Sequence, residues 1–183
     1  MKKYGSGFTI VELLIVVVVI AILAAITIVS YNGISQRAKN TEVLSRIDSY
    51  TKIFQLYKVQ NGAFPGIVST EAGNTVTACL GDPSEYPLSS PFSAGNCGQQ
   101  NSTVYNASAT LVSQLKTISP NLPAGTIPAI VVNGNNYRGL MYSYIDSTNA
   151  NITYVLSGNN DCARGTKIYE SSLNLTICVV ALS

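Results

Sequence analysis

A long hydrophobic run dominates the first part of the chain. From Leu13 to Ile26 no side chain is polar, and within residues 8–31 Glu12 is the one carboxylate. An α-helix rises about 1.5 Å per residue, so a helix over residues 8–31 is long enough to cross a hydrocarbon layer of about 30 Å. The pattern predicts a membrane-spanning helix over residues 8–31.

The hydrophobic run then gives way to an amphipathic pattern. Hydrophobic side chains recur every three to five residues with charged side chains between them, as expected for a helix with one buried face. These positions are Ile34, Ala38, Val43, Ile47, Tyr50, Phe54 and Tyr57. The two patterns join directly, which predicts one helix from Phe8 to about Gln60. Its amphipathic part (residues 32–61) is expected to pack on a sheet of the same chain, and Asn32-Gly33 is a candidate kink.

Turn-forming residues follow the predicted helix. Gly62 is expected to end it, because glycine readily adopts the conformation found at helix C-termini. Residues 66–102 are rich in Gly, Pro, Ser and Asn and show no sustained period, so they are interpreted as a long connecting loop. A short amphipathic helix from Ala107 to Ile118, capped by Asn106, is expected next.

The last third of the chain shows the period of two that is typical of β-strands. The expected strands are Ile127–Val132, Tyr137–Ile145, Asn151–Leu156 and Leu173–Leu182. Turns at Asn133-Gly134-Asn135-Asn136 and Ser147-Thr148-Asn149-Ala150 separate the first three. The predicted fold is α+β, with a long N-terminal helix packed on a C-terminal antiparallel sheet of about four strands. Residues 62–183 form its globular head.

Low charge and the absence of histidine limit the possible functions. Only 11% of the residues are charged and the net charge is +2, which favours an exported surface domain and gives no broad basic surface for nucleic acid. Without histidine there is no Ser-His-Asp triad and no His-based metal site. Asn159-Asn160-Asp161 offers oxygen ligands, but a turn is the preferred interpretation. The sequence predicts neither an enzyme nor a cofactor or metal.

The four cysteines indicate disulfides. They are Cys79, Cys97, Cys162 and Cys178, with no Cys-x-x-Cys pair among them. A zinc site would require four scattered thiolates, so two disulfides formed in an oxidising compartment are the preferred interpretation. Sequential pairing, Cys79 with Cys97 and Cys162 with Cys178, is the hypothesis among three connectivities. Four buried thiols are the alternative.

Glu12 is unexpected inside a hydrophobic run, because an ionised group in a membrane span costs on the order of 2.5 to 3.5 kcal/mol. It belongs to a motif in which Gly7 is followed by Phe8-Thr9-Ile10-Val11-Glu12-Leu13, after a short Lys-containing leader. This motif resembles the class III signal peptide of type IV pilins and pseudopilins. In that family a membrane-embedded prepilin peptidase cuts after the glycine and usually methylates the new N-terminus.

The resemblance implies roles for three residues. Cleavage is expected between Gly7 and Phe8, which makes residues 1–7 a leader peptide and Phe8 the N-methylated first residue of the mature chain. Glu12 is expected to pair with the Phe8 amine of a neighbouring subunit and so to set the register of assembly. A charge that is costly alone in lipid becomes tolerable when paired. The alternative is a carboxylate near the helix end that reaches the lipid headgroups.

A weaker match lies at the end of the long helix. Tyr57, Gly62, Phe64 and Pro65 resemble a Tyr…Gly-aromatic-Pro signature of many pseudopilins and Gram-positive-type pilins. Together the two matches cover residues 1–66 and imply the pilin fold.

The resemblance implies a pilin-like structural subunit that starts as a single-pass protein of the cytoplasmic membrane and polymerises into an extracellular filament or cell-surface structure. Expected partners are prepilin peptidase, other pilin subunits, the membrane platform that assembles the pilus, and the membrane before assembly. Two alternatives stay open. One is a pseudopilin or minor pilin of a type II secretion or DNA-uptake system. The other is a signal-anchored surface protein that binds a ligand through residues 66–102 without polymerising.

Overall fold

The computed structural model confirms the α+β fold class and divides the chain into two compact units, Met1–Thr41 and Glu42–Ser183. It describes residues 9–67, 76–100, 103–124 and 129–183, with the backbone alone for residues 28–40, Val132 and Ser157. The first unit contains the hydrophobic part of helix α1, and the second contains the rest of α1 and the head.

Helix α1 runs from Ile10 to Asn61, close to the predicted limits. Its backbone stays helical through Asn32 and Gly33, so the weak helix propensity of this pair does not end the helix. Gly62 follows with φ of 77°, and its N–H donates to the carbonyl of Lys58 at 2.8 Å. Glycine therefore ends the helix as predicted, in a left-handed conformation that other residues rarely adopt.

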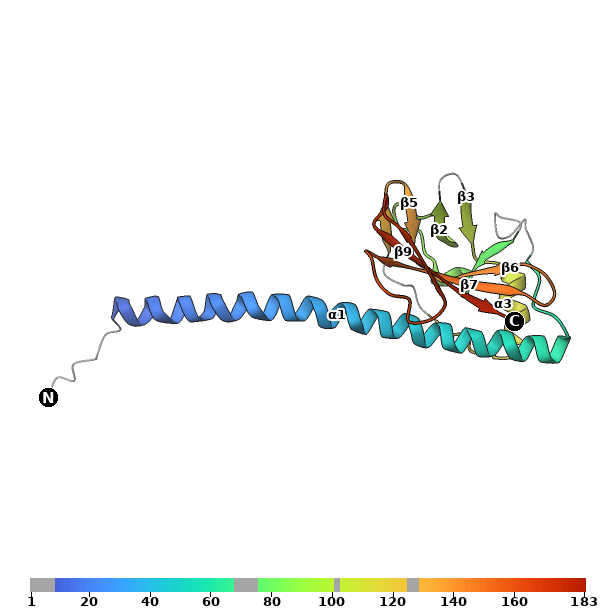
Figure 1. The fold of residues 1–183 in the computed structure, drawn as a ribbon, viewed down its shortest axis with the longest axis horizontal. Coiled ribbons are helices and arrows are strands. Elements are labelled where there is room, and N and C mark those ends of the chain that lie inside the picture. The colour runs from blue at the N-terminus through green and yellow to red at the C-terminus, as the bar shows by residue number, and fades with distance from the viewer. Residues whose placement is uncertain (1–8, 68–75, 101–102, 125–128) are drawn as a thin grey trace. The chain divides into compact units, whose positions relative to one another are not determined.

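The larger sheet has five antiparallel strands (Figure 1). Their order in the sheet is β1 (Thr77–Cys79), β6 (Met141–Tyr144), β7 (Ala150–Ser157), β9 (Leu175–Leu182) and β8 (Thr166–Glu170). The central pair, β7 and β9, is the longest, with eight residues of each strand in register from Ala150 opposite Leu182 to Ser157 opposite Leu175. Strand β8 forms an edge, and all five of its residues are exposed.

A smaller sheet has four antiparallel strands. Their order is β3 (Thr103–Asn106), β2 (Asn96–Gln100), β5 (Asn135–Tyr137) and β4 (Ile130–Val132). Strands β4 and β5 form a hairpin around Asn133 and Gly134, whose φ angles of 48° and 78° are both positive. Asn-Gly is the preferred pair for such a two-residue turn, because its backbone twist matches that of the strands.

The structure adds a second sheet and strand β8 to the prediction. Residues 127 and 128 of the predicted strand Ile127–Val132 lie outside the described residues, and β4 begins at Ile130. Two further predictions need correction around β5 and β6. The predicted strand Tyr137–Ile145 is in fact the end of β5 and the whole of β6, which belong to different sheets. The predicted four-residue turn is also too long, because Asn135 and Asn136 are buried residues of β5. Both errors have one cause: short strands are defined by distant partners, and the sequence pattern alone does not reveal where the chain changes sheets.

The predicted loop 66–102 contains regular structure, and the short helix begins later than predicted. Within the loop lie β1, β2 and the 3-10 helix η1 (Pro83–Glu85). Helix α3 spans Ala109–Lys116, and its cap is Ser108, whose hydroxyl accepts from the Leu111 N–H at 3.1 Å. The predicted cap, Asn106, belongs to β3. The Ala107 N–H donates to the carbonyl of Gly95 at 2.8 Å, which keeps the chain extended for one more residue.

The main core lies between the C-terminal part of α1 and one face of the five-stranded sheet. Val43, Ile47, Tyr50 and Phe54 are buried, which confirms the predicted stripe at these positions. Ile34 and Ala38 lie outside the described side chains. The four buried residues of α1 share this core with residues of the sheet and of α3, among them Tyr142, Ile152, Tyr154, Val180, Leu182, Leu111 and Leu115. The amphipathic part of α1 therefore buries its apolar face within the head.

A second core lies on the opposite face of the same sheet. Successive residues of a strand point to opposite faces, so Tyr142 belongs to the first core while its neighbour Met141 belongs to the second. Val155 and Leu175 join Met141 there, together with Tyr137 of the smaller sheet. Strands β6, β7 and β9 therefore bury side chains on both faces, with α1 packed on one face and the smaller sheet on the other.

Candidate functional site

Helix α1 begins with a capping box formed by Thr9 and Glu12. The Thr9 N–H donates to Oε2 of Glu12 at 2.8 Å, and the Thr9 hydroxyl donates to the same oxygen at 2.7 Å. In return, the Glu12 N–H donates to the Thr9 hydroxyl oxygen at 3.2 Å. This reciprocal arrangement satisfies backbone donors that have no partner inside the helix. Glu12 therefore has a local structural role at the helix start.

The capping role was readable in the sequence but was not predicted. Thr9-Ile10-Val11-Glu12 is a Thr-x-x-Glu pattern at the beginning of an apolar helix, which is the signature of a capping box. A cut between Gly7 and Phe8 would leave this box intact, because the Thr9 N–H remains a peptide group. Gly7 and Phe8 themselves lie outside the described residues.

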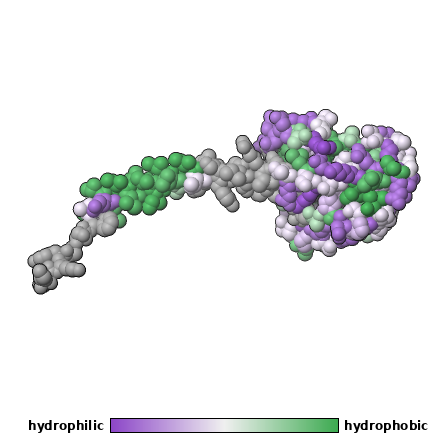
Figure 2. Space-filling model, turned by 90° about the horizontal axis from the view of Figure 1, so that it is seen from below, coloured by the Kyte–Doolittle hydropathy of each residue, from purple (hydrophilic) through white to green (hydrophobic). Residues whose placement is uncertain are grey.

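The surface of α1 from Ile10 to Thr27 is hydrophobic all round. This 18-residue stretch is long and apolar enough to cross a membrane, and none of it is buried within the protein. Figure 2 shows hydrophobic residues covering this part of the helix, whereas the surface of the head is mixed. So large an exposed apolar surface is unfavourable in water.

Thr27, the polar side chain that follows Glu12 in this stretch, is satisfied within the helix. The Thr27 hydroxyl donates to the carbonyl oxygens of Leu23 and Ala24, at 3.0 and 2.9 Å. Such bonds to the preceding turn let a hydroxyl lie in an apolar environment without an unpaired donor. The helix surface is therefore compatible with lipid along the whole stretch that follows Glu12.

The segment after Gly62, which contains Phe64 and Pro65 of the predicted signature, is fixed to the head. Phe64 is buried and its N–H donates to the Ser147 carbonyl at 2.9 Å. The ammonium of Lys58 lies 4.8 Å from the centre of the Phe64 ring. The hydroxyl of Tyr142 donates to the Pro65 carbonyl at 2.9 Å. Aromatic packing and backbone hydrogen bonds thus hold the end of α1 against the turn between β6 and β7.

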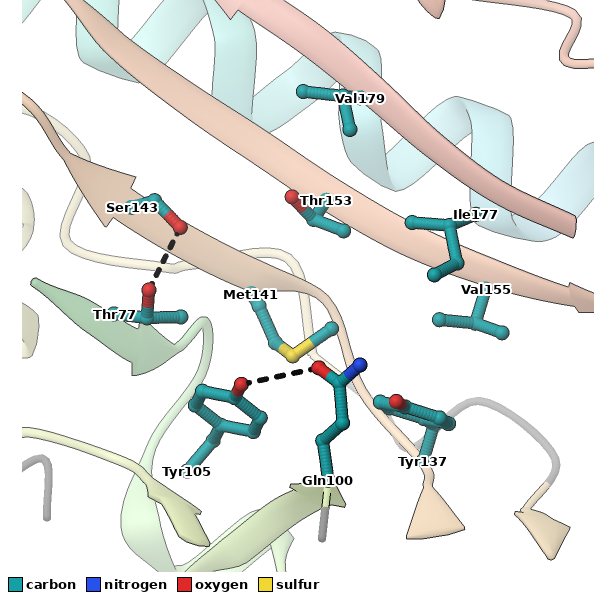
Figure 3. Close-up of a pocket in the computed structure, with 10 residues that line it drawn as sticks. All are labelled: Thr77, Gln100, Tyr105, Tyr137, Met141, Ser143, Thr153, Val155, Ile177 and Val179. Carbon is teal, nitrogen blue, oxygen red and sulfur yellow. Dashed lines mark hydrogen bonds between the residues drawn. The ribbon is translucent and has the colours of Figure 1, made fainter. Parts of the chain in front are cut away.

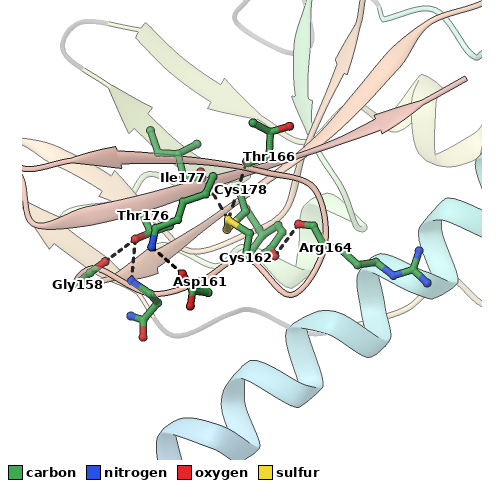
Figure 4. The surroundings of a disulfide bond; sticks show 11 residues. Gly158, Asp161, Cys162, Arg164, Thr166, Thr176, Ile177 and Cys178 are labelled. Atoms are coloured by element: carbon green, nitrogen blue, oxygen red, sulfur yellow. Dashed lines mark hydrogen bonds and ion pairs between the residues drawn. A yellow bond between two sulfur atoms is a disulfide. The ribbon is translucent and has the colours of Figure 1, made fainter.

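Both disulfides have the sequential pairing that was predicted. Cys79 bonds to Cys97 and Cys162 bonds to Cys178, with 18 and 16 residues of separation. The first joins β1 to β2 and therefore links the two sheets, with both cysteines fully buried. The second attaches the segment before β8 to β9 (Figure 4). Each bond closes a loop that would otherwise cost more conformational entropy on folding.

Hydrogen bonds order the segment around Cys162. The Thr176 hydroxyl donates to the Gly158 carbonyl at 2.7 Å and accepts from the Asn160 N–H at 3.0 Å. The Tyr154 hydroxyl donates to the Arg164 carbonyl at 3.0 Å, and the Arg164 guanidinium lies 2.7 Å from Oδ1 of Asp48 on α1. Figure 4 shows the hydrogen bonds of Thr176 and of the Arg164 carbonyl around the disulfide. The segment is therefore an ordered surface feature of the head.

Asp161, the acidic member of the candidate oxygen ligands at residues 159–161, forms an ion pair. Its Oδ1 lies 2.9 Å from the ammonium of Lys167. This hydrogen bond and the positive charge of Lys167 lower the pKa of Asp161 below its usual range. Across the described residues, no cluster of three or more His, Cys, Asp or Glu side chains is placed to hold a metal ion. The Asp161 carboxylate is therefore held by a lysine close to it in the sequence.

The chain combines a long apolar N-terminal helix with a disulfide-bonded α+β head. Proteins of this class carry a globular head on a membrane-compatible helix. Comparison with known proteins narrows this class. Residues 2–28 match the family described as "Prokaryotic N-terminal methylation motif". The type IV wide pilus major component PilA4 of Thermus thermophilus is 31% identical over 102 residues, which covers 51% of this chain and 78% of that protein. The chain belongs to the type IV pilin and pseudopilin family.

Other relatives match a smaller share of the chain. The type II secretion system core protein G of Aeromonas hydrophila is 31% identical over 72 residues, covering 39% of this chain and 48% of that protein. The type IV major fimbrial protein FimA of Dichelobacter nodosus is 42% identical over 66 residues, covering 36% of this chain and 40% of that protein. The chain thus spans less than half of these two relatives. No solved structure matches the chain.

Proposed function

We propose that the chain is a structural subunit of a type IV pilin-like filament. The observation that carries the proposal is the fully exposed apolar surface of α1 from Ile10 to Thr27. Lipid covers this surface while the chain is a single-pass membrane protein, and the helices of other subunits cover it after polymerisation. The same surface therefore serves two environments, because both exclude water from apolar side chains.

Processing precedes assembly. Prepilin peptidase cuts between Gly7 and Phe8 and methylates the new N-terminus at Phe8, so that residues 1–7 are removed. The match of residues 2–28 to the N-terminal methylation motif supports this step. The mature chain then begins one residue before Thr9, and the capping box with Glu12 still starts the helix.

Glu12 has an intersubunit role in addition to its cap. Both hydrogen bonds that it accepts from Thr9 end on Oε2. A carboxylate has about four acceptor sites over its two oxygens, so capping leaves capacity for the Phe8 amine of a neighbouring subunit. Pairing offsets the cost of a charge in an apolar environment and fixes the axial position of one helix against the next.

The head is displayed outside the cell, attached to the filament by the amphipathic part of α1. The two disulfides support this location, because they form in oxidising compartments. Partners are the prepilin peptidase, other pilin subunits and the membrane platform that assembles the pilus. The role is structural rather than enzymatic.

A second candidate in the same family is a pseudopilin or minor pilin of a type II secretion or DNA-uptake system. The similarity to type II secretion system core protein G favours it. The two candidates share processing and helix packing and differ in the length and surface exposure of the filament.

Mass spectrometry of the mature N-terminus, from membranes and from sheared cell-surface material, tests the proposal. A chain that begins with methylated Phe8 in both fractions is the expected result. Mature chains confined to the membrane fraction would favour the pseudopilin. An intact Met1, or a cut beyond Ala25, would contradict both candidates and leave a signal-anchored or secreted surface protein.

A further inference from the structure

A cavity of about 230 Å³ lies between the two sheets of the head. Its walls come from β1, β6, β7 and β9 of the larger sheet, including Thr153 of β7, and from β2, β3 and β5 of the smaller one (Figure 3). It is somewhat smaller than the clefts of about 300 to 1,000 Å³ that hold drug-sized ligands. Its size therefore suits one small chemical unit.

One wall of the cavity is aromatic. Gly98, on β2, has no side chain, and a Cβ there would lie 3.1 Å from the Tyr105 ring and 3.4 Å from the Tyr137 ring. The two aromatic rings occupy that room and form one wall. Val155 and Ile177, which face them from the larger sheet, form an apolar wall opposite.

Hydrogen-bonding groups without charge complete the lining. The Thr77 and Ser143 hydroxyls lie 2.9 Å apart, and the Tyr105 hydroxyl donates to Oε1 of Gln100 at 3.4 Å. Figure 3 shows the Gln100 amide extending between the two tyrosines, and its NH₂ group supplies two further donors. Burial, and then the neighbouring Tyr105, raise the pKa of Tyr137 to about 12, so its phenol is neutral at physiological pH.

We propose that this cavity binds a neutral carbohydrate unit, a single monosaccharide residue. A sugar ring has a C–H face that packs on aromatic rings and hydroxyls that exchange hydrogen bonds with amide and hydroxyl groups. An ionic ligand would find no opposite charge among the lining side chains. A pure hydrocarbon would make no use of the lining hydroxyls or of the Gln100 NH₂ group, which a polyhydroxylated ligand can engage. The cavity thus matches a ligand that is both apolar on one face and polyhydroxylated at its edge.

Met141 provides a reporter for the test, because it lines the cavity and is one of two methionines in the chain. The full chain is prepared with ¹³C-methyl methionine in a detergent that carries no sugar, and a Met141→Leu variant assigns the signal. Methyl glycosides of glucose, galactose, mannose and N-acetylglucosamine are titrated one at a time, with phenol as an aromatic probe. The expected result is a saturable shift of the Met141 signal by at least one glycoside, with a Kd on the order of 1 mM.

Two variants separate specific binding from general effects. Gln100→Ala removes the amide and Thr153→Val removes a hydroxyl without a change of shape, and each should raise the Kd by about fivefold. Gln60→Ala, which alters an exposed residue of α1, should leave the Kd unchanged. The proposal is overturned if no glycoside shifts Met141 at about 50 mM, if phenol alone binds, or if Gln100→Ala and Thr153→Val bind as tightly as the unmodified chain.

Discussion

The ring of Phe54 on α1 stacks on the ring of Tyr142 on β6, with centroids 4.3 Å apart and planes 10° from parallel. Tyr142 also donates its hydroxyl to the Pro65 carbonyl. Burial raises the pKa of Tyr142, and the neighbouring Tyr144 and Tyr57 add to this effect. Tyr142 therefore contacts both the buried face of α1 and the segment that follows α1.

Phe54→Ala should destabilise the head by about 3 to 5 kcal/mol, because it leaves a cavity against Tyr142 at a fully buried position. Leu56→Ala on the same helix is the control, since Leu56 is 57% exposed and should cost less than about 1 kcal/mol. The unfolding free energies of both variants are measured by denaturant unfolding of the full chain in detergent, with tyrosine fluorescence as the signal. Equal losses from the two variants would show that α1 does not depend on this contact.

Arg138 organises the segment between η1 and β2 from a buried position. Its Nε donates to the Asn96 carbonyl at 2.7 Å, and its Nη atoms donate to the carbonyls of Pro87 and Ser93 at 2.7 and 3.0 Å. The guanidinium lies 4.5 Å from the centre of the Phe92 ring. Burial lowers the pKa of Arg138 from its usual value. A planar cation is thus surrounded by backbone acceptors and an aromatic face, which suits arginine more than lysine.

Arg138→Lys should therefore cost on the order of 3 kcal/mol, because an ammonium cannot reach all these acceptors and buried carbonyls lose their partners. Amide hydrogen exchange should accelerate over residues 87–96. Arg164→Lys is the matched control: its exposed ion pair with Asp48 should contribute less than about 1 kcal/mol. Unchanged exchange over residues 87–96 in Arg138→Lys would refute the organising role.

The capping and pairing roles of Glu12 can be separated. Glutamine at this position of a capping box keeps the hydrogen bonds but not the charge. We expect Glu12→Gln and Glu12→Ala both to be processed normally and to lose surface filaments. Thr9→Ala should weaken the helix start by about 1 kcal/mol and retain filaments. Electron microscopy and the N-terminal mass report the outcomes, and abundant filaments from Glu12→Gln would show that capping is the sole role of the carboxylate.

The two disulfides should differ in their response to a reductant under native conditions. Cys79 and Cys97 are both fully buried, whereas Cys162 is only partly buried. Exchange requires a thiolate to reach a sulfur atom, so Cys162 and Cys178 should be alkylated first, as read by peptide mass mapping. Denatured protein should label at all four positions. Simultaneous labelling of the native chain would indicate that the fold does not protect the first bond.

Asp146 should make the turn between β6 and β7 dependent on pH. Its Oδ1 accepts from the Asn149 side chain and from the N–H and hydroxyl of Thr148, which lowers the pKa of Asp146 to about 2. The unfolded value is about 3.9. Because the folded pKa is depressed, this contribution to stability is present above about pH 4 and is lost as the pH falls through about 2.

Asp146→Asn should therefore flatten the pH dependence of the unfolding free energy below about pH 4. Glu170→Gln, which changes an exposed carboxyl on β8, serves as the charge-matched control. Denaturant unfolding between about pH 7 and pH 2 provides the comparison. An identical acid dependence in Asp146→Asn and the unmodified chain would exclude a contribution from this turn.

The sequence by itself determined the long helix, its two kinds of surface and its end at Gly62. These features are local: an uninterrupted apolar run, a periodic stripe and a residue with a special backbone conformation are all written in contiguous residues. The Thr9–Glu12 cap was equally local and was missed only because Glu12 was interpreted through its charge. The motif around Glu12 also indicated the family before any coordinate was known.

Only the tertiary structure decided how the head is built. Tyr137 and Met141 lie four residues apart in an apparently continuous strand, yet they belong to different sheets. Strands as short as β1 and β5 gain their structure from partners far away in the chain, so no local pattern marks them. The cavity between the sheets arises in the same way, because its walls are assembled from strands whose spacing is set by long-range packing rather than by neighbouring residues.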